Sequence, residues 1–153
     1  PVSGPLPGDP VPVVSVEQLD VNIGATLPSL TSATAGCDLV VLLSAYCSHC
    51  ERLRHTWANA YRTWVDSVGT SVNAIWVVRE ERSVATPFVE GFDLAGATAV
   101  VLSRGMESAW RARLGVVATP MAYLVDPEGL IQEGVMGPQL PSARRTRRIC
   151  AGR

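Results

Sequence analysis

Apolar residues gather along the chain in short segments that alternate with polar or helix-patterned ones. The near-continuous apolar run at residues 38–45 indicates a central strand that is buried on both faces. Four later segments are also strand-like: residues 72–78, 97–103, 121–126 and 130–136. The last two flank residues 126–129, where Pro in second place and Gly in fourth favour a type I turn and hence an antiparallel hairpin.

Apolar residues at helical spacing follow the first predicted strand. Leu53, Trp57, Tyr61, Trp64 and Val68 succeed one another at steps of four, four, three and four, so they share one stripe of a helix. We therefore predict a helix over residues 48–67 whose apolar stripe faces the sheet. Three further helices are expected, at residues 84–92, 105–114 and 141–149.

The first 36 residues carry weaker patterns. Residues 1–12 hold five prolines and two glycines, which favours an extended lead-in or linker over a helix. Residues 13–20 indicate a short strand, and the small and polar residues 21–36 predict a loop with at most one edge strand. Residues 13–153 then form one domain in which strands and helices alternate before a hairpin. This order is typical of an α/β fold with a mostly parallel sheet.

Length and charge narrow the class of protein. The 153 residues, 47% of them apolar, suit a single domain that can bury a core. A formal charge of -1 provides no basic field for nucleic acid. No apolar run reaches the ~18 residues of a membrane span. Because the chain starts with Pro1, we expect a mature or trimmed form that can have a membrane tether upstream. We also expect the protein to be a monomer.

Two cysteines one helical turn apart stand where the first predicted strand ends and the long helix begins. The unpaired N–H groups and partial positive charge of a helix N-terminus stabilise a thiolate. The helix stripe, extended backwards, places Cys50 on the buried face and Cys47 at its edge. Cys47 is therefore the candidate attacking sulfur and Cys50 the candidate resolving sulfur. His49 would stabilise the Cys47 thiolate as an imidazolium; an exposed ring without that contact is the alternative.

Other uses of this cysteine pair fit less well. Structural zinc needs a second cysteine pair or histidines at ligand spacing, whereas Cys37 and Cys150 stand alone in the sequence. Covalent haem attachment needs a His after the second cysteine, where this chain has Glu51. We therefore expect no metal and no cofactor. A purely structural disulfide is the remaining alternative.

The apolar strand, the cysteine pair and the helix after it resemble the thioredoxin superfamily, as does the Thr-Pro pair before residues 121–126. In that superfamily a cis-proline at this place faces the cysteines and leaves a backbone edge for an extended substrate. The resemblance implies that Thr119, Pro120 and the aromatic Tyr46 contact substrate. It covers about residues 8–140 and implies a thioredoxin-like fold with a mixed central sheet.

The 70 residues between Cys50 and Pro120 leave room for an extra strand and helix between the cysteine helix and the cis-proline strand. This insertion and the Pro-rich lead-in resemble the TlpA, ResA and MauD-like thiol-disulfide oxidoreductases, which act outside the cytoplasm. The chain departs from the superfamily's patterns at three places near the cysteines. Val41 stands where minimal thioredoxins have a buried Asp, Leu53 stands where ResA-like proteins have a Glu, and His55 replaces a helix-kinking proline.

Peroxiredoxins share the longer fold but place Pro and Thr before their cysteine. Val40 and Ser44 stand at those places, which argues against a peroxidase. Some TlpA-like proteins join their N- and C-terminal regions by a disulfide, and by this resemblance Cys37 and Cys150 form one. Two separate thiols are the alternative.

The sequence thus predicts a thiol-disulfide oxidoreductase, active outside a bacterial cytoplasm, that exchanges disulfides with partner proteins in either direction. Its partners would be protein thiols or disulfides and a redox partner protein. The alternative is a redox-sensitive protein-binding module or maturation chaperone without turnover.

Overall fold

The computed structural model describes residues 5–19, 23–32, 36–115 and 119–151. The strands are β1 (Ser15–Gln18), β2 (Gly24–Thr26), β3 (Cys37–Leu43), β4 (Val72–Val78), β5 (Thr98–Leu102), β6 (Met121–Val125) and β7 (Ile131–Met136). The helices are α1 (Leu27–Ser32), α2 (Ser48–Val68), α3 (Arg82–Val89), α4 (Glu107–Ala109) with its continuation as the π-helix η1 (Trp110–Leu114), and α5 (Ala143–Cys150).

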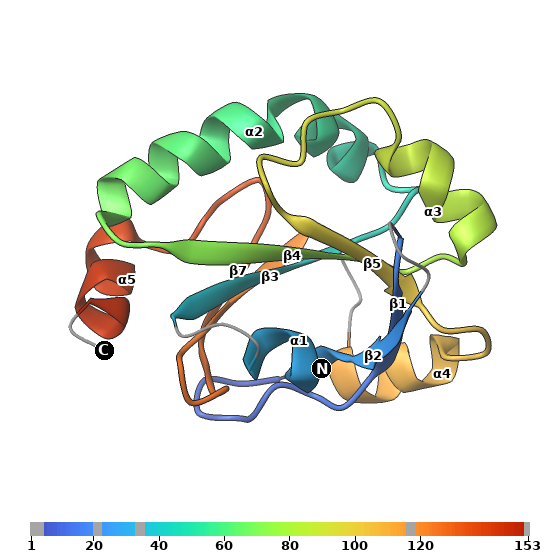
Figure 1. Ribbon diagram of the computed structural model, residues 1–153, viewed down its shortest axis with the longest axis horizontal. Coiled ribbons are helices and arrows are strands. Elements are labelled where there is room, and N and C mark those ends of the chain that lie inside the picture. Colours follow the sequence, from blue (N-terminus) through green and yellow to red (C-terminus); the bar gives the residue numbers. More distant parts are fainter. Residues whose placement is uncertain (1–4, 20–22, 33–35, 116–118, 152–153) are drawn as a thin grey trace.

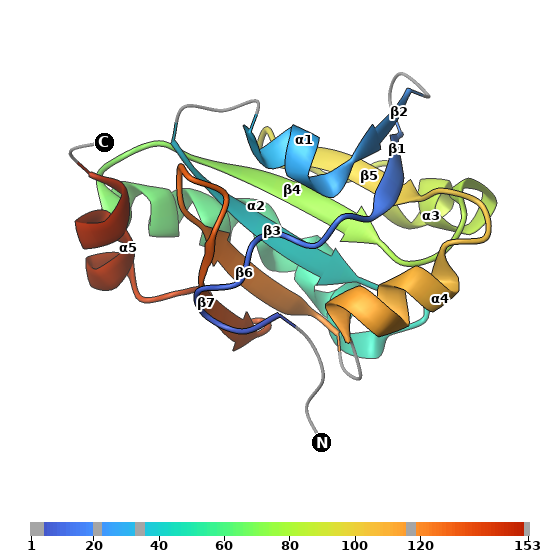
Figure 2. The ribbon, with the colours of Figure 1, turned by 90° about the horizontal axis from the view of Figure 1, so that it is seen from below.

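Within these residues seven strands form one mixed sheet in the order β2-β1-β5-β4-β3-β6-β7. The three central strands β5, β4 and β3 run parallel, and the flanking strands pair antiparallel. Helices α2 and α3 cover one face of the sheet, and α1 and α4 cover the other (Figures 1 and 2). Helix α3 and strand β5 lie in the sequence between α2 and β6, where the length of the chain predicts an inserted helix and strand.

The central strand β3 is buried along its whole length, as its apolar sequence predicts. Leu39 and Val41 pack on the α2 side of the sheet. Val40 and Leu42 pack on the opposite side, in the same cluster as Trp110. The two faces of this strand therefore belong to two separate core clusters, and the loop after β3 is carried on a rigid element.

Helix α2 buries the predicted stripe, with Cys50 added at its first turn; the buried residues are Cys50, Leu53, Trp57, Tyr61, Trp64 and Val68. The helix ends at Gly69, whose left-handed backbone donates an N–H to Val65 O. The aromatic residues of the stripe contact one another, with Trp57 stacked on Tyr61 at 4.8 Å between ring centroids. This packing fixes the helix against the sheet and with it the position of Cys50.

The prediction of a loop over residues 21–36 was wrong in part, because α1 occupies Leu27–Ser32. Its residues lack an apolar stripe, so hydrophobic periodicity gives no signal. The helix is started by a reciprocal cap: Thr26 N–H donates to Ser29 Oγ, and Ser29 N–H donates to Thr26 Oγ1. Leu27 is the apolar residue of this helix that is fully buried, with 1% of its surface exposed.

The described part of the Pro-rich lead-in, residues 5–12, contains a turn closed by the Asp9 N–H, which donates to Leu6 O, and contacts the hairpin of β6 and β7. Gly8 N–H donates to Ile131 O at 2.7 Å, and Val11 N–H donates to Gly129 O at 3.0 Å. Val11 is buried. Residues 1–4 of the lead-in lie outside the described residues.

A disulfide between Cys37 and Cys150 ties the first residue of β3 to the last residue of α5, with Cα atoms 5.7 Å apart. Both cysteines are buried. On the same helix, Arg147 donates to Val68 O at 3.0 Å and to Ser67 O, two carbonyls at the end of α2. Helix α5 is thereby joined to both β3 and α2, beside which it lies in Figure 1.

Candidate functional site

The nucleophile predicted from the sequence stands at the start of α2. Cys47 is the N-cap residue, with extended backbone angles, and its sulfur accepts the Cys50 N–H at 3.2 Å. Cys47 is partly exposed, whereas Cys50 has no exposed surface. Both are thiols in this structure. One sulfur can therefore meet a protein substrate while the other is shielded behind it.

The Thr119–Pro120 segment lies directly opposite this helix end. The Cys47 thiol donates to Thr119 O at 3.2 Å, across 72 residues of sequence. The Thr119–Pro120 peptide bond is cis, Pro120 is buried and Thr119 is partly exposed. The residue whose carbonyl Cys47 contacts is thus partly open to solvent.

The two cysteine thiols have pKa values shifted in opposite directions. Burial alone would raise the pKa of Cys47, but hydrogen bonds from the side chains of Cys50 and Thr119 oppose it. Backbone N–H groups of Cys50 and His49 also stabilise the thiolate, so the pKa of Cys47 falls below its ordinary value. Burial raises the pKa of Cys50 to about 12, with a further contribution from the Cys47 side chain. Of the two thiols, the partly exposed Cys47 is therefore the one that ionises more readily.

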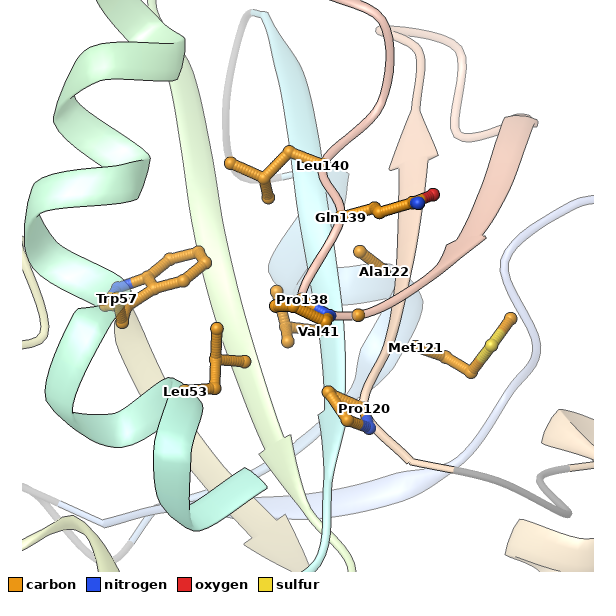
Figure 3. A pocket seen from close by; sticks show the side chains of 10 residues that line it. Val41, Leu53, Trp57, Pro120, Met121, Ala122, Pro138, Gln139 and Leu140 are labelled. Carbon is orange, nitrogen blue, oxygen red and sulfur yellow. The ribbon is translucent and has the colours of Figure 1, made fainter. Parts of the chain in front are cut away.

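A narrow cavity lies between α2 and the sheet, beside Pro120 (Figure 3). Its lining is Val41, Leu53, Trp57, Pro120, Met121, Ala122, Gly137, Pro138, Gln139 and Leu140. Val41 and Leu53, two of the departures noted in the sequence, both line it. Among the described residues no titratable side chain lines this cavity.

Gly137 packs against the cis-proline, although no sequence motif points to it. Its N–H donates to Pro120 O at 2.7 Å. A Cβ at this position would lie 2.4 Å from Pro120 Cγ and 3.0 Å from Pro120 Cβ, so only glycine fits. The signal available in the sequence is a Gly-Pro pair after β7, which by itself indicates only a turn.

His49 is exposed, and the Arg52 guanidinium contacts its Nδ1. A guanidinium has only donors, so the imidazole accepts at Nδ1 in this arrangement. The contact between His49 and Cys47 is made by the backbone N–H of His49. An effect of the His49 ring on Cys47 stays a prediction.

Apolar side chains are exposed around the cysteines. Tyr46, next to Cys47, has 78% of its surface exposed, and Met136 has 57%. Met136 is the cross-strand partner of Met121, which follows the cis-proline. Tyr46 and Met136 are thus exposed apolar side chains, one next to Cys47 and the other paired with the strand that follows the cis-proline. Binding of substrate by Tyr46, Thr119 and Pro120 stays a prediction.

The carboxylate of Glu80 reaches the loop that carries Cys47, although nothing in the sequence marks this residue. It accepts the Ala45 N–H and the Ser44 hydroxyl, both at 2.7 Å.

Among the described residues no group of three or more His, Cys, Asp or Glu side chains is arranged to hold a metal ion. In the same part of the chain no helix is long and apolar enough to cross a membrane.

The sequence matches no family model and no curated protein. Solved structures do resemble the chain. The thioredoxin domain of a thiol-disulfide oxidoreductase from Bacteroides vulgatus matches with a TM-score of 0.68 and 20% identity, over 86% of this chain and 90% of that one. The fold of this chain is thioredoxin-like.

Two other structures share this thioredoxin-like fold. A protein designated thiol:disulfide interchange protein DsbE, from Chlorobium tepidum, matches with a TM-score of 0.65 and 16% identity over 94% of both chains. A thiol peroxidase from Chromobacterium violaceum matches with a TM-score of 0.68 and 16% identity, over 95% of this chain and 86% of that one. The fold predicted from the cysteine and Thr-Pro motifs is therefore confirmed.

Proposed function

We propose that this chain is a thiol-disulfide oxidoreductase that exchanges disulfides with proteins. The observation that carries the proposal is the position of the Cys47 sulfur. It lies at the N-terminus of α2, 3.2 Å from Thr119 O, with the buried Cys50 one turn further along the helix. The likeness to a thiol-disulfide oxidoreductase domain and to a thiol:disulfide interchange protein supports it.

The reaction follows from the two thiols. In the reducing direction the Cys47 thiolate attacks a substrate disulfide, a mixed disulfide forms, and the first substrate sulfur leaves and takes up a proton. Cys50 then loses its proton and attacks the Cys47 sulfur. The Cys47–Cys50 disulfide forms, and the second substrate thiol leaves. The substrate gains two electrons and two protons, and the enzyme dithiol supplies them; the oxidising direction reverses every step.

The substrate backbone would lie along Thr119 and Pro120, with Tyr46 and Met136 as apolar contacts. The enzyme works as a monomer outside a bacterial cytoplasm and needs a second redox protein to restore its cysteines. The disulfide between Cys37 and Cys150 supports this location, because such bonds persist in oxidising compartments. A tether upstream of residue 1 is part of the same proposal.

Reduction of the disulfides of insulin, measured as turbidity with a chemical reductant in excess, tests the activity. We expect turnover by the wild-type chain, none above background for Cys47→Ser, and accumulation of a mixed disulfide for Cys50→Ser. If the wild-type chain were no faster than Cys47→Ser in both insulin reduction and oxidative refolding of a reduced protein, the proposal would be wrong. A redox-sensitive binding module would then be favoured.

A further inference from the structure

The loop between β3 and α2 is held from the neighbouring strand by one carboxylate. Glu80 Oε1 accepts the Ala45 N–H and Glu80 Oε2 accepts the Ser44 hydroxyl, both at 2.7 Å. The parallel register pairs Leu43 with Val78, so Ala45 and Glu80 each stand two residues beyond the last pair of the ladder. The Glu80 side chain thus links the segments that follow β3 and β4, at the point where the backbone hydrogen bonds between the two strands have ended.

Ser44 links Glu80 to Tyr46 and Cys47 by two further hydrogen bonds. Its Oγ accepts the Tyr46 N–H at 3.2 Å, and its carbonyl accepts the Cys47 N–H at 3.2 Å. Ser44 is buried, with 8% of its surface exposed, so water does not readily replace these bonds. Every residue from Ser44 to Cys47 is therefore tied, directly or through Ser44, to Glu80.

We propose that Glu80 is the positioning residue of the cysteine loop, which it holds so that the Cys47 sulfur meets both the Cys50 N–H and the Thr119 carbonyl. Glu80 acts through the loop and has no recorded contact with either sulfur. The inference rests on the proposed function, since it assigns Glu80 a part in preparing the nucleophile.

The surroundings of Glu80 favour this role over a local structural one. Its neighbour Glu81, not Glu80, is the N-cap of α3. Arg79 pairs with Glu107 at 3.7 Å, and among the described residues no Arg or His forms an ion pair with Glu80. The shallow cleft beside Glu80 is lined by these charged groups together with Met106 and others. The recorded hydrogen bonds of the carboxylate all go to the cysteine loop.

Glu80→Gln tests the inference, read as the pH dependence of the ultraviolet absorbance of the Cys47 thiolate and as its alkylation rate at pH 7. In a glutamine one acceptor oxygen is replaced by an NH2 donor, so it cannot accept both the Ala45 N–H and the Ser44 hydroxyl on separate oxygens as Glu80 does. We expect a higher pKa for Cys47 and alkylation slower by up to about tenfold, the factor for one pKa unit. If Glu80 acted on Cys47 only through its negative charge, the variant would instead have a lower Cys47 pKa and faster alkylation, because loss of a nearby negative charge favours the thiolate.

Glu81→Gln is the matched control, since it removes the adjacent carboxylate, and we expect no change. Ser44→Ala removes one tie and should shift the pKa of Cys47 in the same direction as Glu80→Gln, by less. A folded Glu80→Gln variant with an unchanged or lower pKa for Cys47 would overturn the inference. If that variant does not fold, a folded Ser44→Ala variant with the wild-type pKa overturns it. Because thiolate titration needs no turnover, failure of the proposed function would show separately in the insulin assay.

Discussion

In the proposed reaction, the surroundings of Cys50 set the speed of the second chemical step. Burial raises the pKa of Cys50 to about 12, and among the described residues no acidic or basic side chain lines the cavity beside Val41 and Leu53. In a mixed disulfide Cys47 carries no charge, but burial still keeps Cys50 protonated. The structure therefore favours a mixed disulfide that forms readily and resolves slowly.

The rate of resolution should consequently rise with pH. Below the pKa of Cys50 the thiolate fraction grows about tenfold for each pH unit, and resolution should follow it from pH 6 to 9. A mixed disulfide of Cys47 with a chromophoric thiol, monitored by stopped flow, would give this rate directly. A rate independent of pH in that range would mean that some group takes the proton from Cys50.

Gly137 is the second residue that the account depends on. Gly137→Ala would place a methyl group 2.4 Å from Pro120 Cγ and push the cis-proline segment away from Cys47. We expect a higher pKa for Cys47 and slower insulin reduction, because the Thr119 side-chain hydrogen bond that lowers this pKa weakens. Gly24→Ala, where nothing lies within 4 Å of the new methyl group, is the control. Equal activity of the two variants would show that Pro120 does not need its present position.

At the scale of elements, α2 is stabilised from a neighbouring helix. Arg147 of α5 donates to the carbonyls of Ser67 and Val68, which have no partner within α2 because they end it. Arg147→Ala should lower the free energy of unfolding by about 1 kcal/mol. For a chain of this length that is a fall in Tm of roughly 2–4 °C.

A thermal melt of each variant measures this effect. Arg148→Ala is the matched control, since Arg148 is exposed on the same helix and no partner for it is recorded within residues 119–151. The same Tm for both variants would show that α5 contributes nothing to the end of α2. The two variants should reduce insulin at equal rates, because Cys47 and Cys50 lie at the other end of α2.

Patterns confined to one element could be predicted from the sequence, and contacts between elements could not. The stripe of α2 and the all-apolar β3 repeat a local period, so their burial was predictable. Helix α1 begins with a Thr-Ser cap and has no apolar stripe, so it was missed. Glu80 is 35 residues from Ala45, and their contact depends on a strand register that one sequence does not fix.

At the scale of the molecule, the Cys37–Cys150 disulfide closes a separation of 113 residues. Loss of such a bond from a chain of this kind costs about 2–5 kcal/mol, chiefly by freeing the unfolded chain. The double variant Cys37→Ala, Cys150→Ala should therefore unfold at a clearly lower denaturant concentration. Its thiolate titration should match that of the wild-type chain, since Cys37 is at the opposite end of β3 from Cys47. A changed Cys47 pKa would mean that this disulfide also shapes the site.

The central claim is that Cys47 is the thiolate nucleophile and Cys50 its protonated partner. The most direct test is alkylation of the fully reduced, folded chain at pH 7 for increasing times, with each cysteine read separately by peptide mass spectrometry. The account predicts that Cys47 is modified first while Cys50 stays unmodified, and that unfolding in denaturant removes the difference. Modification of Cys50 first, or of both at one rate in the folded chain, would contradict it.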